Sequence, residues 1–343
     1  MNILTVITPS RLGGAEIYAG CLCKWEQANG NKIVLAMKPN HRVEMYFSDL
    51  GLDVRVVGIS GKLNLRATPR IREIIRAEKI DIVHAHLSTA ALWGCRAARA
   101  EGVPAAAHVH SLNSATTFRS ADKVIAVSRA AKNHLVAQGI PADRIAVVYP
   151  GIAGDLREPA ADIAGFGEQV VAYAGALRED KGVGVLLAAF KQVIEAVPSA
   201  RLAIAGEGPD RARFEEVARR AGIWEQVRFL GFREDVPSIF AASKVVAAPS
   251  LKPEGFGLVV VEANAAGASV VASDVGAVGE VFEAGIVGSL VAPGNEGALA
   301  GAIVAVLNRP RDPDRCIAAS RRFSLEASAT ACMNVFEGLI GSQ

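Results

Sequence analysis

The sequence predicts an α/β protein built from two doubly wound parallel-sheet domains that face a central cleft, and three observations support this prediction. The chain has 343 residues, about twice the length of a typical domain. Short, β-branched apolar runs alternate with helical stretches along the whole chain, which is typical of β-α-β units. Between Tyr149 and Gly167 the alternation lapses into Gly, Pro, Ala and charged residues, which indicates a linker.

The first half contains seven short runs that we expect to be strands: residues 3–7, 32–36, 53–57, 81–84, 105–110, 124–127 and 145–148. Helical spacing is clear in three of the segments between them: residues 15–27, 69–78 and 129–138. Strands this apolar are typical of a parallel sheet that helices cover on both faces.

The second half repeats the pattern with strands expected at residues 170–174, 201–205, 227–230, 244–248 and 270–272. Helices are expected at residues 183–196, 210–221 and 258–266. The remaining segment, Asp314–Ile340, has helical spacing but too little strand to form a sheet of its own. We therefore expect two Rossmann-like domains, residues 1–155 and 156–312, and a helical tail at residues 313–343.

Composition excludes several classes of protein. Hydrophobic residues make up 51% of the chain and charged residues 21%, which excludes a disordered chain. No run approaches the roughly 20 apolar residues of a membrane span, and Met1–Pro9 lacks the basic start of a signal peptide. The five scattered cysteines are expected to be reduced thiols in a cytoplasmic protein. A dinucleotide dehydrogenase would carry G-x-G-x-x-G after its first strand, which this chain does not have.

Charge divides unequally between the two halves. Residues 1–150 hold 19 Lys and Arg against 11 Asp and Glu, a net +8, and residues 151–343 hold 18 against 24, a net −6. The basic half could face an anionic acceptor or an anionic membrane surface, or it could simply be a solvated surface. A run of cations surrounds one short predicted helix: Lys62, Arg66, Arg70, Arg72, Arg76 and Lys79. No nucleic-acid motif is present, so nucleic acid is not an expected partner.

Ligands of open α/β sheets bind where the strands end, so the strand-to-helix turns are the places to search for chemistry. The first turn carries Gly13 and Gly14 just before a helix, where free backbone N–H groups can bind an anion. The turn at residues 175–182 places Arg178 and Lys181 between glycines, an arrangement that suits a diphosphate. A tight turn and a charged surface loop are the structural alternatives at these two places.

The segment at residues 249–262 is the most informative. Glu254 lies in a loop after a strand, Gly255 and Gly257 flank Phe256, and a helix begins near Leu258, with Glu262 about one turn inside it. The two carboxylates could accept hydrogen bonds from hydroxyl groups on different parts of one ligand, while the free amides of residues 255–258 face its phosphates. A sugar nucleotide has its parts in this order.

Histidines occur in pairs at the ends of two strands. Alternation places His108 and His110 on one face of their strand, and His84 with His86 repeats the pattern one strand earlier. His110, nearer the strand end, is the better candidate to contact substrate hydroxyls, and a buried structural histidine is the alternative. Four histidines so placed could suggest a metal, but no metal is expected, because no nearby Asp or Glu completes a ligand set. The only Asp-x-Asp sequence, Asp312-Pro313-Asp314, is interpreted as a turn and a helix cap.

Glu254 and Glu262 form an E-x7-E pattern that resembles the retaining glycosyltransferases of family 4, which have the GT-B fold. Further segments match in family order: Gly13-Gly14-Ala15-Glu16, the strand end at His110, Val127-Ser128, and residues 148–152, 206–209, 227–231 and 291–294. The resemblance covers most of the chain and is most specific at residues 170–305.

This resemblance implies an enzyme that moves a sugar, with retention, from a nucleotide-diphosphate sugar to a glycan or lipid-linked glycan of cell-envelope polysaccharide biosynthesis. The first domain would bind the acceptor and the second the donor, without a metal or other cofactor. The tail helix would cross back toward the first domain. The protein would be cytoplasmic, with a peripheral contact on the inner face of the membrane as one interpretation.

The resemblance also assigns roles to individual residues. Glu254 would bind the donor sugar and Glu262 the ribose, and the amides of residues 256–258 would hold the diphosphate with Lys181. His110 and the turn at Gly13 and Gly14 would reach the sugar and the phosphates. Gly231, Phe232 and Arg233 would lie beside the base. The catalytic candidates are thus His110, Lys181 and Glu254.

One position departs from the family pattern. The family commonly has an arginine where this chain has Ala176, and that arginine binds the diphosphate. Arg178 could supply the charge instead; otherwise the loss of one charged contact would weaken donor binding roughly 10- to 150-fold. A sugar-nucleotide 2-epimerase and a non-catalytic two-domain sugar-binding protein are the alternative functions, and the second would need an export signal.

Overall fold

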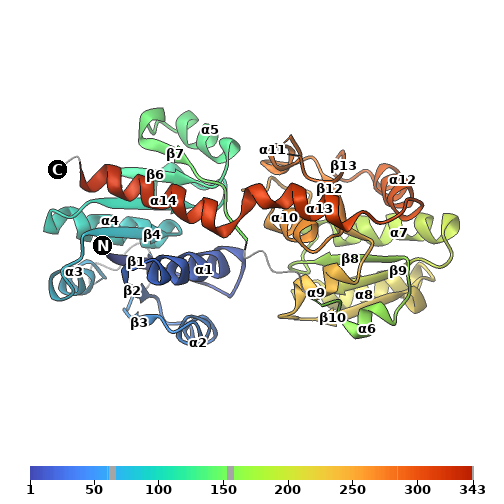
Figure 1. Cartoon of the computed structure of the whole chain (residues 1–343). Coiled ribbons are helices and arrows are strands. Elements are labelled where there is room, and N and C mark those ends of the chain that lie inside the picture. Colours follow the sequence, from blue (N-terminus) through green and yellow to red (C-terminus); the bar gives the residue numbers. More distant parts are fainter. Residues whose placement is uncertain (60, 62–66, 153–157, 284, 342–343) are drawn as a thin grey trace. The chain divides into compact units, whose positions relative to one another are not determined.

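The computed structural model describes residues 1–59, 61, 67–152, 158–283 and 285–341 of the chain (Figure 1). Packing divides the chain into two compact units. The first comprises Met1–Ala153 and Phe323–Gln343, and the second comprises Gly154–Arg322. The second unit therefore ends ten residues beyond the expected end at residue 312, so the predicted tail is shared between the units.

The first unit contains a seven-stranded parallel sheet in the order β3-β2-β1-β4-β5-β6-β7. Its strands are β1 (Asn2–Ile7), β2 (Lys32–Met37), β3 (Asp53–Val56), β4 (Ile82–His86), β5 (Ala105–Val109), β6 (Lys123–Ala126) and β7 (Ile145–Val147). All seven predicted strands are present, and the doubly wound α/β class is confirmed.

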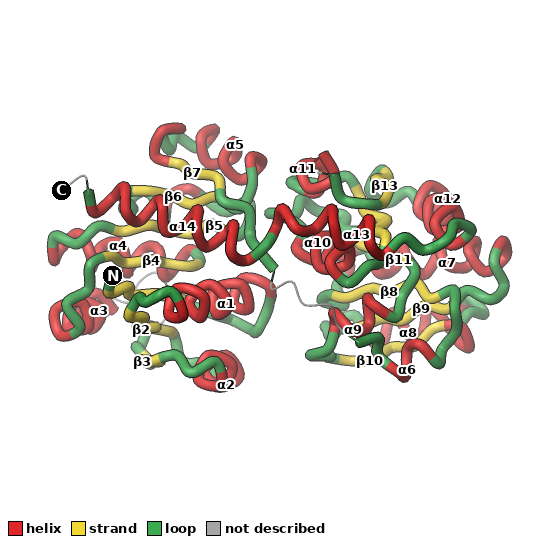
Figure 2. The backbone as a smooth tube through the Cα atoms, in the orientation of Figure 1, coloured by secondary structure: helices red, strands yellow, loops and turns green. Residues whose placement is uncertain are grey.

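Helices cover both faces of this sheet, as Figure 2 shows for each unit. They are α1 (Gly14–Ala28), α2 (His41–Asp49), α3 (Ala67–Ala77), α4 (Ser88–Glu101), α5 (Arg129–Ala137) and α14 (Leu325–Ile340). The alternation of β1 explains the two layers: Ile3 and Ile7 share one core with side chains of α1, α2 and α14, whereas Val6 faces Gly94 of α4. The sequence did not predict α4, because its buried positions are mostly small residues that give no apolar stripe.

The second unit contains a six-stranded parallel sheet in the order β10-β9-β8-β11-β12-β13. The strands are β8 (Val170–Ala174), β9 (Arg201–Ala205), β10 (Val227–Gly231), β11 (Val245–Ala248), β12 (Ser269–Ser273) and β13 (Gly288–Val291). Its helices are α6 (Ala161–Ala164), α7 (Val183–Ala196), α8 (Arg211–Arg220), α9 (Val236–Ala241), α10 (Leu258–Ala265), α11 (Val278–Glu283), α12 (Glu296–Leu307) and α13 (Pro313–Ser320). Five of the six strands were predicted; β13 was missed because it is short and begins Gly-Ser.

Strand β8 runs through the centre of this second unit. Val171 and Tyr173 contribute to a core shared with α7, α8 and α12. Helices α9 and α13 both pack against α10. The carboxylate of Asp312 accepts a hydrogen bond from the backbone N–H of Arg315 at 3.1 Å, so Asp312 caps α13 as the sequence predicted.

The last helix, α14, belongs to the first unit and packs against α1. Tyr18 of α1 donates a hydrogen bond to the hydroxyl of Ser328 at 2.8 Å, and Ser328 in turn donates to the carbonyl oxygen of Tyr149 at 2.7 Å. Just before α14, Ser324 forms a parallel bridge with Ile152. The first unit is therefore completed by a segment from the far end of the chain.

Gly151 is the position at which this docking tolerates no side chain. A Cβ at Gly151 would lie 2.4 Å from the carbonyl oxygen of Ser324 and 2.5 Å from the Cα of Leu325. We expect Gly151→Ala to lower stability by about 1–3 kcal/mol, because backbone would have to move. Thermal and urea unfolding of the full chain measure this. Gly338→Ala within α14 is the control, since its Cβ meets nothing within 4 Å; equal losses in both variants would contradict the prediction.

Candidate functional site

Two turns of the second unit, one after β8 and one after β11, carry most of the predicted donor residues. The two strands are parallel neighbours, so both turns leave the same edge of the sheet. Gly182 has a φ of +73°, and a Cβ there would lie 1.9 Å from the carbonyl oxygen of Pro249. The N–H of Leu251 donates to the carbonyl oxygen of Asp180 at 2.9 Å. The backbones of the two turns are therefore in direct contact, which only glycine at position 182 allows.

This contact brings Lys181 and Glu254 together, 73 residues apart in sequence. The Lys181 ammonium donates to Oε1 of Glu254 at 2.6 Å, with side chains 30% and 25% exposed. The hydroxyl of Ser250 donates to the same oxygen at 2.5 Å. Ser250 was not among the predicted site residues; its only signal was its place at the end of β11. The site thus holds a cation and a carboxylate that compensate each other and remain accessible.

The helix after Glu254 begins with a free end. Gly257 has a φ of +91° and precedes α10 without a side-chain cap. Phe256 is 4% exposed and anchors the turn, and Gly255 is buried beside it. Helices leave their first amides without intrahelical acceptors, so the N–H groups of Leu258 and Val259 are available to an anion. The N–H of Val260 already donates to the carbonyl oxygen of Gly257 at 2.9 Å.

Glu262 lies on α10, as the sequence predicted, and its environment is unusual. Burial raises the pKa of its carboxyl from the ordinary 4.5 to about 7. Within the described part of the chain, no hydrogen-bond partner for this carboxyl is present, although the side chain is partly exposed. A carboxyl of this kind gains most from a ligand that donates hydrogen bonds to its charged form.

Arg178, the predicted substitute for the arginine missing at Ala176, forms a two-bond ion pair with Asp180. Its Nε and Nη2 donate to the two oxygens of Asp180, each at 2.9 Å, and its side chain is 46% exposed. The guanidinium is therefore already paired in the free protein. To contact a diphosphate, the guanidinium would have to break one or both of its hydrogen bonds to Asp180.

The segment predicted to lie beside the base begins at the last residue of β10. Gly231 has a φ of +72°, and its carbonyl oxygen accepts from the N–H of Gly206 at 2.7 Å. Phe232 is 38% exposed. Arg233 pairs with both Asp235 and Asp162 through bonds of 2.6–3.4 Å, and these bonds raise its pKa further. The guanidinium of Arg233 thus ties α6 to the start of α9, a structural role that the sequence did not reveal.

In the first unit, the turn at Gly13 and Gly14 leads into α1, whose N-cap is Gly13. Glu16 is 6% exposed, and burial raises the pKa of its carboxyl while hydrogen bonds from the backbone of Glu16 and Gly13 lower it in part. The Glu16 carboxylate therefore already occupies part of the anion-binding capacity that the sequence predicted for this turn.

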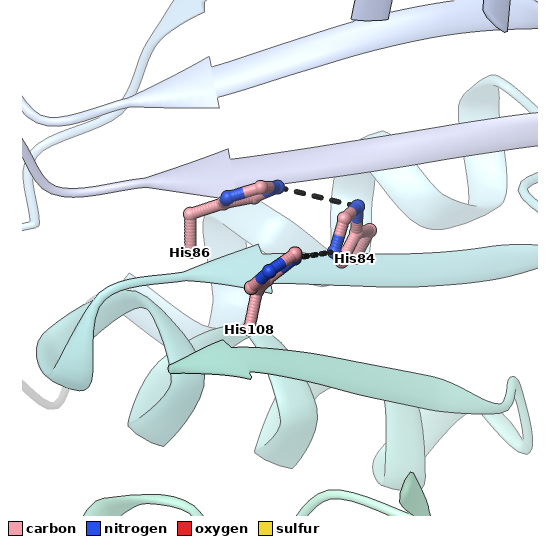
Figure 3. A group of neighbouring side chains, drawn as sticks. All are labelled: His84, His86 and His108. Carbon is pink, nitrogen blue, oxygen red and sulfur yellow. Dashed lines mark hydrogen bonds between the residues drawn. The ribbon is translucent and has the colours of Figure 1, made fainter. Parts of the chain in front are cut away.

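The four predicted histidines lie together on the face of the sheet that α1 and α14 cover. Figure 3 shows His84, His86 and His108, whose rings approach one another from β4 and β5. The rings of His108 and His110 are stacked, with centroids 4.6 Å apart, which confirms that they share a face. The nitrogens of His84, His86 and His108 lie within 4.8 Å of one another, so these three could hold a metal ion. The sequence analysis weighed the four histidines together as a possible metal site, and the structure brings three of them close enough for one without any Asp or Glu in the group.

Two Rossmann-like units with parallel sheets, and a cation–carboxylate pair beside the start of a helix, agree with the GT-B class of glycosyltransferase, and the comparisons with known proteins identify this class. The family model described as "Glycosyltransferase Family 4" matches residues 12–155, and that described as "Glycosyl transferases group 1" matches residues 162–323. A phosphatidyl-myo-inositol mannosyltransferase of Mycobacterium leprae is 30% identical over 95% of this chain and 93% of its own. The chain belongs to glycosyltransferase family 4.

Solved structures agree on the fold. Anabaena Alr3699/HepE, in complex with UDP and glucose, matches with a TM-score of 0.85 and 25% identity over 99% of this chain and 100% of its own. A glycosyltransferase from Rickettsia africae matches with a TM-score of 0.86 and 19% identity over 100% of this chain and 99% of its own. The GT-B architecture predicted from the sequence is confirmed.

Glu262 gives a pH prediction for the free protein. Its folded-state pKa, about 7, is above the ordinary 4.5. Between pH 4.5 and pH 7 the folded state therefore keeps a proton that the unfolded state has lost. Its contribution to stability is therefore present at low pH and is lost as the pH rises toward 7. We expect the melting temperature of Glu262→Gln to rise relative to wild type between pH 5 and pH 8. The exposed Glu195→Gln should show a constant difference, and a constant difference for Glu262→Gln would refute the assignment.

Proposed function

We propose that this glycosyltransferase moves a sugar, with retention and without a metal, from a nucleotide-diphosphate sugar to a glycan or lipid-linked acceptor of the cell envelope. The observation that carries the proposal is the Lys181–Glu254 pair beside the uncapped start of α10. The nucleotide bound by Anabaena Alr3699/HepE and the lipid in the name of the Mycobacterium leprae relative support the donor and acceptor classes.

Lys181 and the amides of residues 256–258 are the proposed diphosphate ligands. In the free site the ammonium of Lys181 is neutralised by Glu254 at 2.6 Å. A bound diphosphate would take over this cation, and Glu254 would then accept hydrogen bonds from the sugar hydroxyls. Ser250, which donates to Glu254 at 2.5 Å, would hold the carboxylate in position during the exchange.

Glu262 is the proposed ligand of the ribose. Ribose hydroxyl groups donate hydrogen bonds to a carboxylate and favour its charged form, so the burial that raises its pKa to about 7 would be compensated only when the donor is bound. Residues 231–233 remain the candidates for the base. His110, Gly13 and Gly14 remain the first unit's candidates for contacts with sugar and phosphate.

Catalysis in this proposal is mainly electrostatic. Charge develops on the departing diphosphate as the sugar–oxygen bond breaks, and preorganised cations and N–H groups stabilise it. The proposed reaction is a front-face displacement in which the leaving phosphate accepts the acceptor's proton, and Ser250 positions Glu254 without attacking the sugar. The proposed catalytic residues are Lys181, Glu254 and His110.

Lys181→Ala tests this role. Removing the ammonium deletes the stabilising charge and leaves Glu254 facing the phosphates, so we expect kcat for donor hydrolysis or transfer to fall about 10²- to 10³-fold. Lys191→Ala, on the exposed side of α7, is the matched control and should be unaffected. Wild-type turnover is expected to persist in EDTA. Full activity of Lys181→Ala would refute the role, and release of an isomerised nucleotide sugar would favour an epimerase.

A peripheral membrane contact is the second part of the proposal, and it rests on helix α3. Among the described helices, none is long and apolar enough to cross a membrane. Ile71 and Ile75 are buried, so they face the core, and Arg72 and Arg76 both pair with Glu101. Of the cations predicted to face a membrane, Arg70, Arg76 and Lys79 are exposed, and of these three only Arg76 is paired with Glu101. Lys62 and Arg66 lie outside the described residues.

Binding to vesicles tests the contact. Each cation near an anionic surface contributes about 1 kcal/mol, so Arg70→Glu with Lys79→Glu should weaken binding to phosphatidylglycerol vesicles at least about tenfold. Lys191→Glu with Arg309→Glu makes the same change of charge on the second unit and is the control. Equal vesicle binding by both double variants would contradict the proposed contact, as would no binding by wild type.

A further inference from the structure

The four histidines of the first unit form one unbroken chain of ring nitrogens. Nδ1 of His108 lies 3.2 Å from Nε2 of His84, and Nδ1 of His84 lies 3.2 Å from Nε2 of His86. Nδ1 of His86 lies 2.9 Å from Nε2 of His110. Figure 3 shows the first two of these links as dashed lines. This histidine chain runs from the buried His108 to the partly exposed His110, just after β5.

Every link has the same polarity, Nδ1 of one ring to Nε2 of the next. A neutral imidazole carries one N–H and one acceptor nitrogen, and each link needs one of each. If one ring is protonated on Nδ1, its Nε2 must accept, so the ring before it must also be protonated on Nδ1. Only two arrangements satisfy all three links: every ring protonated on Nδ1, or every ring on Nε2.

The rings are neutral because burial, complete for three of them and partial for His110, disfavours the charged form. Burial lowers the pKa of His84 to about 3 and of His110 to about 4, and lowers those of the other two as well. Aromatic side chains pack on the group: Tyr18 of α1 against His108 and His110, and Phe336 of α14 against His84. No described carboxylate accepts a hydrogen bond from these four histidines, so none is present to stabilise an imidazolium.

The two ends of the chain decide between the arrangements. Nε2 of His108 is buried and has no hydrogen-bond partner among the described residues. Protonation on Nε2 throughout would place an unpaired N–H at this end, and orphaned buried N–H groups are rarer than orphaned acceptors. Protonation on Nδ1 throughout leaves only a lone pair there. It also places an N–H on Nδ1 of His110, at the partly exposed end.

We infer that His84, His86 and His108 are positioning residues that hold His110 neutral with its proton on Nδ1, as a fixed hydrogen-bond donor. His110 cannot pass a proton inward, because the chain ends at a nitrogen without a partner. Its role is therefore to donate to a substrate oxygen and not to act as a base. That role rests on the proposed function, whereas the position of the proton does not.

Long-range ¹H–¹⁵N NMR of the histidine-labelled full chain at pH 7, without substrate, reads the protonated nitrogen of each ring. We expect all four rings to carry the proton on Nδ1. His41 and His134, the only other histidines, serve as internal references. A proton on Nε2 of His110, or an imidazolium there, would overturn the inference.

A matched pair of variants tests the coupling. In His86→Asn the side-chain amide can still donate to Nε2 of His110, whereas the similarly sized His86→Leu cannot. We expect His110 to keep its Nδ1 proton in the Asn variant and to become a mixture of both forms in the Leu variant. An unchanged His110 in the folded Leu variant would show that the chain does not set its protonation. If the Leu variant does not fold, the wild-type spectrum alone still decides the inference.

Zinc distinguishes the donor chain from a metal site. Zinc bound by His84, His86 and His108 would need lone pairs that accept hydrogen bonds within the histidine chain. The inference therefore predicts that the signals of these rings do not change on addition of Zn²⁺. Zinc-dependent shifts reversed by EDTA would replace the inference with a metal site. Because these spectra are recorded without substrate, loss of the proposed function and loss of the inferred proton position are separate outcomes.

Discussion

The backbone contact between Gly182 and Pro249 is the constraint on which the candidate site depends. It joins the turns after β8 and β11 so closely that a Cβ at position 182 would lie 1.9 Å from a carbonyl oxygen. Lys181 is the neighbour of that glycine, and its ammonium reaches Glu254 at 2.6 Å only because the two turns touch. A charged pair and the start of α10 are thereby brought together at one edge of the sheet, which is the arrangement of a cation, a carboxylate and helix-start N–H groups on which the proposed site rests.

Burial tunes the ionisable groups of the two units in opposite directions. It raises the pKa of Glu262 to about 7 and lowers that of His110 to about 4, in each case because the charged form loses water. At neutral pH His110 is therefore uncharged, and Glu262 is close to the midpoint of its titration. Glu262 can recover its charge when hydrogen-bond donors arrive, whereas His110 is fixed as a donor by the rings behind it. Desolvation therefore sets the protonation of both groups: Glu262 as an acceptor once it is charged, and His110 as a neutral donor.

Much of the fold was predictable because the signals are local. Strand runs such as 3–7 are apolar and β-branched, and Glu254 and Glu262 keep a spacing that can be read without a structure. Elements built from small residues were missed: α4 buries Ala90, Ala91 and Gly94, which give no amphipathic period. The division of residues 313–343 between the two units was also not predictable, since it depends on which surface each helix finds.

The sequence by itself determined the alternation of strands and helices, the two parallel sheets and the turns that carry the candidate residues, because these follow from the period and chemistry of neighbouring residues. Only the tertiary structure decided which side chains meet. It paired Arg178 with Asp180 and Arg233 with Asp162, placed Ser250 on Glu254, and linked two histidine pairs into one chain. These contacts join segments through the geometry of loops and adjacent strands, and side-chain position at that scale is fixed by packing and not by sequence spacing.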